Sequence, residues 1–134
     1  LAQSGYYKGT IFHRIIEDFM IQGGGYIVKD NTLMEAPELA PIKGEFKSNG
    51  IENNISHTRG VISMARTDDP NSASSQFFIV HEDSTFLDGN YAAFGFVTEG
   101  IEVVDKIATT IKVEDDNGTV LFENQPVIKS IRLL

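Results

Sequence analysis

The sequence FHRIIEDFMIQGG, residues 12–24, decides the fold, because it holds two strand-like runs joined by a short acidic turn. Thr10 to Ile16 is rich in β-branched and aromatic residues, and Met20 to Gln22 resumes the same pattern. Gly23 to Gly25 follow directly and are expected to interrupt it. This stretch therefore predicts two successive strands, and the rest of the chain repeats the theme.

Strand signals dominate the remaining sequence. Further strands are predicted at residues 61–66, 76–81, 92–97 and 127–133. Apolar residues at positions 101, 104, 107 and 108 predict one helix with a buried face, over residues 101–108. Residues 26–57 are expected to form a long ordered loop with brief extended pieces, and residues 115–118 the tip of a hairpin. Many strands with one helix favour an antiparallel barrel or sandwich over a βαβ protein.

Composition and charge narrow the class of protein. The 134 residues suit a single domain, residues 1–134, and 41% of them are hydrophobic. The lack of cysteine excludes disulfides and thiolate metal sites and suits a reducing cytoplasm. A net charge of −8 argues against a nucleic-acid or anionic-membrane surface, so neither partner is expected. No apolar run approaches transmembrane length.

The first five residues read as the end of a helix. Leu1 to Gly5 has the pattern of a last helical turn closed by glycine. We therefore expect residues to have preceded Leu1 and the domain to be N-terminally truncated.

Alternation along the strands places mixed side chains on one face. Met20 and Gln22 share a face, as do Gln76 and Phe78, whereas Arg14 lies opposite to its neighbour His13. A purely buried face would carry no Gln or Arg, and a purely solvated one would not carry Met and Phe. Apolar walls with a few polar donors predict a shallow ligand groove.

Other kinds of site are weaker readings. The glycine triplet lacks the spacing of a phosphate-binding loop, and the three histidines are not at metal-ligand spacing. The acidic runs at 68–69 and 114–116 lack the alternation of a calcium loop and read as solvated turns. No serine lies in a G-x-S-x-G motif. No cofactor is expected.

Five blocks of sequence resemble the cyclophilin family of peptidyl-prolyl cis-trans isomerases. In order, they are FHRII from residue 12, FMIQGG from residue 19, GVISMAR from residue 60, SQFFI from residue 75, and FLDG from residue 86 followed by FG at residues 94–95. The MART and GGG sequences are similar to the bacterial cytoplasmic branch. The resemblance implies a mainly β fold: a closed antiparallel barrel capped by helices, here without its N-terminal strands and most of its first helix.

The resemblance also implies a role for twelve residues. Arg14 is implied to be the catalytic group. The expected substrate contacts are a proline pocket of Phe19, Met20, Phe78, Leu87 and Tyr91, polar neighbours His13, Gln22 and Gln76, backbone contacts at Ala65 and Arg66, and the bordering Phe86. Proline-containing polypeptides are the implied partners, and the implied activity assists protein folding.

Two positions depart from the family pattern inside this set. Phe86 stands where many members carry tryptophan, so a cyclosporin-like ligand is expected to bind with reduced affinity. Tyr91 stands where eukaryotic members often have histidine, and because both side chains are flat we expect little effect. The alternative to an isomerase is a module or chaperone that holds proline segments without useful catalysis. A lipocalin-type barrel is less favoured, because large side chains are available to fill its interior.

Overall fold

In the computed structural model, β1 (Thr10–Ile16) and β2 (Met20–Lys29) form an antiparallel hairpin, as residues 12–24 predict. The structure describes the backbone of residues 1–134 and every side chain except that of Phe122. Asp18 turns the chain between the two strands with φ at 63°. Ile11 and Ile15 of β1 point into the core and are almost fully buried, in keeping with the two-residue period of a strand.

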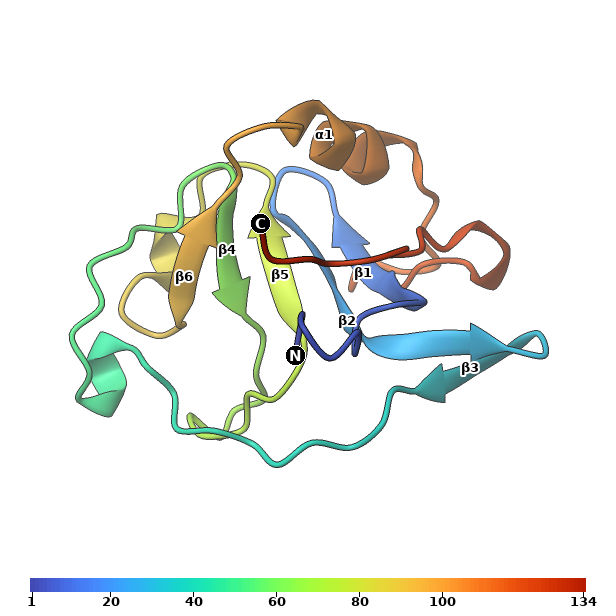
Figure 1. Ribbon diagram of the computed structural model, residues 1–134. Helices are drawn as coiled ribbons and strands as arrows, with labels where there is room; N and C mark the ends of the chain where they lie inside the picture. Colours follow the sequence, from blue (N-terminus) through green and yellow to red (C-terminus); the bar gives the residue numbers. More distant parts are fainter.

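The strands assemble into one antiparallel sheet. Its order is β1-β2-β5-β4-β6, with β3 paired to β2, and the further strands are β3 (Thr32–Glu35), β4 (Val61–Met64), β5 (Phe77–Val80) and β6 (Ala93–Phe96). Figure 1 shows the strands fanning around a curved sheet. The predicted strands at 61–66, 76–81 and 92–97 are confirmed with shorter ends. Barrel closure stays a prediction, because no pairing joins β6 to β1 among the described residues.

The glycine triplet does not break β2, contrary to expectation. β2 continues to Lys29 and turns into β3, so residues 26–35 form a hairpin within the predicted loop. A side chain at Gly23 would approach Ile11 of β1, and one at Gly25 would collide with the side chain of Gln76. Glycine is required at positions 23 and 25 because neighbouring groups approach the backbone closely, and Gly24 between them has φ at 87°, a conformation that favours glycine.

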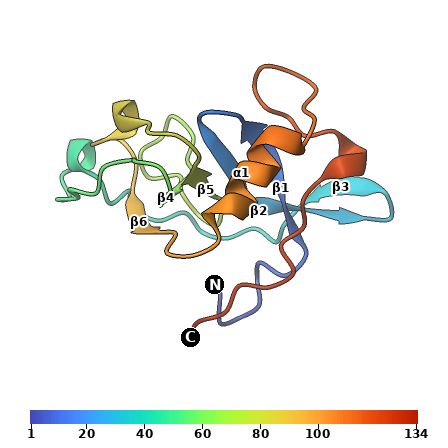
Figure 2. The same ribbon diagram turned by 90° about the horizontal axis from the view of Figure 1, so that it is seen from above.

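One α-helix covers one end of the curved sheet. Figure 2, viewed from above, shows α1 (Ile101–Thr110) lying across β1 and β2. Its buried residues Val104 and Ala108 pack with Ile15 and Ile21 of these strands. A second cluster, on the other side of β2, contains Met20, Val61, Ala65, Phe78, Val80, Leu87 and Ala93. The predicted helix is confirmed and extends two residues further.

Three short 3-10 helices complete the secondary structure. They are η1 (Lys47–Asn49), η2 (Thr85–Leu87) and η3 (Phe122–Asn124). η2 turns Leu87 into the core while Phe86 stays exposed. None of the helices that the structure describes combines the length and the apolar composition needed to cross a bilayer.

The predicted strand at 127–133 is the one that fails to form. Only an isolated bridge joins Val127 to Ile11, supported by hydrogen bonds between Ile128 and its neighbours Gly9 and Thr10. Continuing this pairing would place residues 129–133 opposite the segment before Gly9, which is in turns and offers no strand edge. Alternating side chains alone do not make a strand without a partner.

The first residues have the hydrogen bonds of a helix end. Tyr6 N donates to Leu1 O and Gly5 N donates to Ala2 O, which is the pattern of a Schellman motif. Gly5 has φ at 72°, as that motif requires. The predicted glycine-closed turn is therefore confirmed.

Candidate functional site

Nine of the twelve predicted site residues line one small hollow. Its volume is about 110 Å³, well below the range typical of drug-sized ligands, so it suits a single ring or short side chain. The lining residues are Arg14, Phe19, Met20, Gln22, Ala65, Arg66, Phe78, Leu87 and Tyr91. The structure therefore brings together residues that lie up to 77 positions apart in the chain.

Strand register builds the polar side of the hollow. Arg14 on β1 lies directly opposite Gln22 on β2, and Gln22 lies directly opposite Phe78 on β5. Side chains that face each other across antiparallel strands point to the same side of the sheet. A guanidinium, an amide and an aromatic ring thus form one row across three strands, next to the hollow.

Hydrogen bonds hold the Arg14 guanidinium from two directions. Its Nη1 donates to Gln22 Oε1 at 3.2 Å, and Gln22 Nε2 donates in turn to Gln76 Oε1 at 2.9 Å. Its Nε donates to the backbone oxygen of Asn117 at 2.8 Å, and its Nη2 donates to Asn117 Oδ1 at 3.2 Å. These contacts fix the plane of the guanidinium at the rim of the hollow.

Apolar side chains form the floor of the hollow. Met20, Phe78 and Leu87 are each more than 90% buried, and Phe19 and Tyr91 pack against them. The ring of Tyr91 meets that of Phe78 edge to face, with centroids 5.9 Å apart. Such a floor excludes water from whatever enters and strengthens polar interactions at its rim.

The side chain of Arg66 forms part of the wall of the hollow, next to Tyr91. Its guanidinium lies 4.7 Å from the centroid of the Tyr91 ring and 4.9 Å from that of Phe46. Its Nε and Nη2 both donate to Asn90 O. The cation and the two rings brace the Tyr91 side of the hollow.

Three predicted residues lie outside this hollow. Gln76 lines an adjoining space of about 200 Å³ and joins the site through Gln22. Phe86 is 71% exposed and contacts the site only through the ring of Phe19, at 5.5 Å between centroids. His13 lines a different space together with Tyr26, and Arg14 borders both this space and the hollow.

His13 is held in its neutral form. Burial and the neighbouring positive charge of Arg14 lower the pKa of His13 from 6.5 to about 4. Its Nδ1 is buried and has no hydrogen-bond partner among the described residues. His13 therefore carries no charge near Arg14 at neutral pH.

A serine, a histidine and an aspartate come together beneath the hollow, although no sequence motif signals them. His57 Nε2 lies 2.9 Å from Ser63 Oγ, and His57 Nδ1 lies 2.9 Å from Asp88 Oδ1. Both Ser63 and His57 are fully buried, so no substrate reaches the hydroxyl. The imidazole stacks on Phe78, with centroids 6.0 Å apart, which makes this network a support for the floor.

Sequence reasoning also missed Asn117. Residues 115–118 read as a solvated hairpin tip, and their turn is confirmed by the bridge between Val113 and Val120. Its contact with Arg14 spans 103 positions and leaves no trace in local sequence pattern. Only the pairing of the following segment with β1 reveals it.

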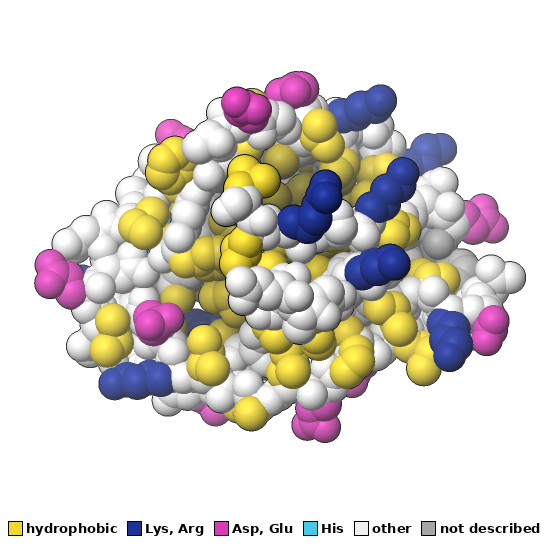
Figure 3. Space-filling model, in the orientation of Figure 1, with side chains coloured by type: hydrophobic (Ala, Val, Ile, Leu, Met, Phe, Trp, Pro, Cys, Tyr) yellow, Lys and Arg dark blue, Asp and Glu magenta, His cyan; other side chains and the backbone are white. Residues whose placement is uncertain are grey.

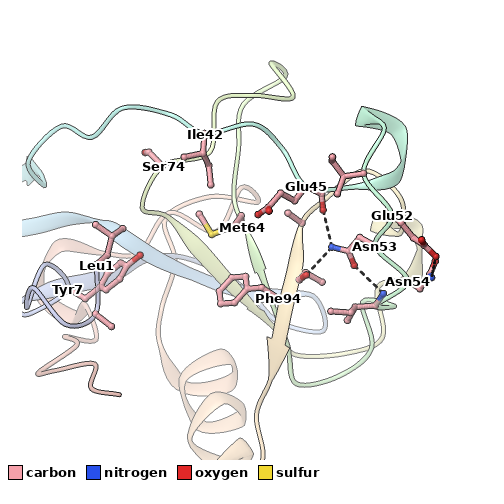
Figure 4. Close-up of a pocket in the computed structure, with 15 residues that line it drawn as sticks. Leu1, Tyr7, Ile42, Glu45, Glu52, Asn53, Asn54, Met64, Ser74 and Phe94 are labelled. Atoms are coloured by element: carbon pink, nitrogen blue, oxygen red, sulfur yellow. Dashed lines mark hydrogen bonds between the residues drawn. The ribbon is translucent and has the colours of Figure 1, made fainter. Parts of the chain in front are cut away.

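A larger hollow lies elsewhere and is lined by none of the predicted residues. It has a volume of about 740 Å³, and Figure 4 shows it between Tyr7, Met64 and Phe94. The Asn53 amide at its edge donates to the backbone oxygens of Glu45 and Ala93, each at 3.0 Å. The smaller hollow beside Arg14 is the better candidate site, because it brings together nine of the twelve predicted residues and sets a guanidinium against apolar side chains.

Comparison with known proteins identifies the family of the chain. The family model described as cyclophilin type peptidyl-prolyl cis-trans isomerase/CLD matches residues 1–133. A peptidyl-prolyl cis-trans isomerase of Acinetobacter baylyi is 50% identical over 112 residues, which is 80% of this chain and 55% of that protein. The isomerase cyp18 of Streptomyces antibioticus is 44% identical, over 99% of this chain and 80% of its own length.

A solved structure shares the arrangement of the backbone. The crystal structure of a Cryptosporidium parvum cyclophilin-type isomerase, determined in the presence of the dipeptide Ala-Pro, superimposes with a TM-score of 0.76 at 29% identity. The match covers all of this chain and 80% of that one. Sequence blocks, family model and backbone agree, and the chain belongs to the cyclophilin-type peptidyl-prolyl cis-trans isomerases.

Proposed function

We propose that this chain catalyses cis-trans rotation about X-Pro peptide bonds in other polypeptides and thereby assists their folding. One observation carries the proposal: Arg14 lines the same small apolar hollow as Met20, Phe78 and Leu87. A proline ring would occupy the hollow, and the guanidinium at its rim would meet the imide bond. The activity of the related isomerases from A. baylyi and S. antibioticus supports the same reaction.

The chemistry requires a hydrogen-bond donor and no nucleophile. The barrier of roughly 18–20 kcal/mol arises because rotation breaks amide resonance. In the twisted state the nitrogen regains a localised lone pair, and no bond to carbon is made. Arg14 would donate to that lone pair, since a guanidinium is always charged and presents its donors in fixed geometry. The donor therefore stabilises the transition state more than either ground state.

The remaining residues would orient the substrate. Met20, Phe78 and Leu87 would hold the proline ring, with Phe19 and Tyr91 as side walls. Gln22 would fix Arg14 while its partner Gln76 meets the chain next to the proline. Backbone groups of Ala65 and Arg66 would pair with the peptide backbone, because these residues directly follow β4 and line the hollow.

Substitution of Arg14 tests the assignment. We expect Arg14→Ala to lower kcat/KM for an X-Pro peptide by about 10²- to 10³-fold, the usual loss for one preorganised donor. Arg14→Lys is the matched control, because it keeps the charge without the planar guanidinium. Its activity should lie between that of the unaltered chain and that of Arg14→Ala. Circular dichroism should show that both variants fold. Turnover by Arg14→Ala at the rate of the unaltered chain would sink the assignment.

We also propose that the chain belongs to the bacterial cytoplasmic branch. The A. baylyi and S. antibioticus relatives are bacterial, and the MART sequence at 64–67 is similar to that branch. Phe86 is exposed and contacts only the edge of the hollow, so a cyclosporin-like ligand should bind weakly. Immunodetection in fractionated cells of the source bacterium should find the protein in the cytoplasm, and a periplasmic location would contradict this.

A further inference from the structure

The turn at residues 115–118, termed here the Asn117 turn, is docked on the outer edge of β1. Ile15 N donates to Gly118 O at 2.8 Å, and Val120 N donates to His13 O at 3.1 Å. Gly118 has φ at 82°, and a Cβ at this position would collide with the carbonyl oxygen of Ile15. The turn can therefore approach β1 this closely only because residue 118 is glycine.

Asp115 closes the turn from within. Its Oδ1 accepts the Thr119 amide at 3.0 Å, and its backbone oxygen accepts Gly118 N at 3.1 Å. The hydrogen bonds from Thr119 lower the pKa of the Asp115 carboxyl, so it is an ionised acceptor at neutral pH. The Asn117 turn is thus a closed loop that is tied to β1 on both sides of residue 14.

This docking places two acceptors of one residue against the Arg14 guanidinium. Asn117 offers its backbone oxygen to Nε and its Oδ1 to Nη2, while Gln22 takes Nη1 from the opposite side. Asn117 itself is exposed to solvent. Hydrogen bonds at exposed positions add little to stability, so the geometric effect on Arg14 is the main consequence of these contacts.

We propose that the Asn117 turn is a positioning device for Arg14, which sets the direction of the guanidinium donors toward the imide nitrogen. The inference rests on the proposed isomerase function and assigns Asn117 a part in it. Arginine has many rotamers, so a donor that is held in place before the substrate arrives loses less entropy in the transition state. Asn117 acts through Arg14 and does not itself contact the substrate.

Two variants of the turn test this role, one by removing a single acceptor and the other by displacing the turn. Asn117→Ala removes Oδ1 and leaves the backbone acceptor, and we expect kcat/KM to fall about fivefold to tenfold, the worth of one such hydrogen bond. Gly118→Ala displaces the whole turn and should cost more, with the loss in kcat rather than in KM. Asn117→Asp keeps the Oδ acceptor and should restore most of the activity. Glu99→Ala, at an exposed position outside the turn, is the control and should turn over normally.

A spectroscopic readout separates positioning from general damage. In chains with ¹⁵N-labelled arginine, hydrogen exchange at Arg14 Nε should be slow in the unaltered chain and in Glu99→Ala. It should speed up in Asn117→Ala and further in Gly118→Ala. Normal turnover and unchanged exchange in Asn117→Ala would overturn the inference even if Gly118→Ala failed to fold. If the unaltered chain did not isomerise an X-Pro peptide, the proposed function would fall instead, so the two failures are distinguishable.

Discussion

At the scale of single residues, the amide side chains of Gln22 and Gln76 help to fix the position of Arg14 through hydrogen bonds. Gln76 holds Gln22, and Gln22 holds Arg14, through hydrogen bonds of 2.9 and 3.2 Å. The side chain of Gln76 lies over Gly25, where no other residue would leave it room. Gly25 is thus connected to Arg14 through two side chains.

Gly25→Ala should therefore lower activity without touching the hollow. The added methyl group must push Gln76 aside, which frees Gln22 and lets Arg14 reorient; we expect kcat/KM to fall about tenfold. Gly95→Ala is the matched control, because a Cβ there meets no atom within 4 Å. Both variants can be compared in the same prolyl-peptide assay. Equal activity of the two would show that these amide hydrogen bonds have no effect on turnover.

At the scale of elements, α1 supports β1 and β2 from behind the site. Val104 and Ala108 on its inner face pack against Ile15 and Ile21, the residues that flank Arg14 and Gln22 in sequence. Asp105 on the same helix pairs with Arg59, which also donates to His81 O. The helix therefore stabilises the strands whose opposite face carries the donor row.

Two adjacent valines of α1 separate packing from helix propensity. Val104 is 6% exposed and Val103 is 56% exposed. Val104→Ala should lower the free energy of unfolding by about 1–3 kcal/mol, because it removes buried methyl groups and leaves a cavity. Val103→Ala should change it by less than about 0.5 kcal/mol, as surface substitutions usually do. Urea unfolding measures both, and similar losses would mean that the inner face is not packed as described.

At the scale of the whole molecule, two clusters of apolar side chains lie on the two sides of β2, and charge lies outside them. Figure 3 shows exposed apolar side chains through the middle of one face, with carboxylates mostly toward its edges. Several carboxylates, among them Asp88 and Asp105, have a lowered pKa; for Asp105 the hydrogen bond from Arg59 is the main cause. Their contribution to stability is present above pH 3.8 and is lost in stronger acid.

His13 makes stability depend on pH in a higher range. Its pKa is about 4 in the folded chain and 6.5 in the unfolded chain, so the unfolded state binds more protons between these values. Stability should be complete above pH 6.5 and decrease as the pH falls toward 4. His13→Phe keeps a ring against Tyr26 but does not titrate, so it should lose less stability between pH 7 and pH 5. Urea unfolding at the two pH values measures this loss in each chain. An equal loss of unfolding free energy in the unaltered chain and in His13→Phe would contradict the prediction.

Sequence pattern predicts the parts of this structure that depend on one segment at a time. The strands of residues 10–16 and 61–64 and the helix from Ile101 follow from local periodicity. The triplet at 23–25 misleads because glycine is typical of turns, whereas here it makes room for Gln76 and β1. The segment 127–133 misleads because a strand also needs a neighbour.

The candidate site likewise has features that one segment of sequence predicts and features that depend on contacts between segments. Alternation correctly pairs Met20 with Gln22 and separates Arg14 from His13, and the family resemblance supplies the roles of the residues. The row from Arg14 through Gln22 to Phe78 depends on register between strands, which a single segment does not encode. Asn117 reaches Arg14 from an exposed turn through a contact across 103 positions.

Exchange NMR on an X-Pro peptide tests the central claim most directly, because it reports rotation and binding in one sample. With the unaltered chain, cross-peaks should connect the cis and trans proline signals. With Arg14→Ala they should vanish, while peptide-induced shifts at Met20, Phe78 and Leu87 persist. Undiminished cross-peaks with Arg14→Ala would contradict the account, and their absence from the unaltered chain would leave a module that binds proline segments without turning them.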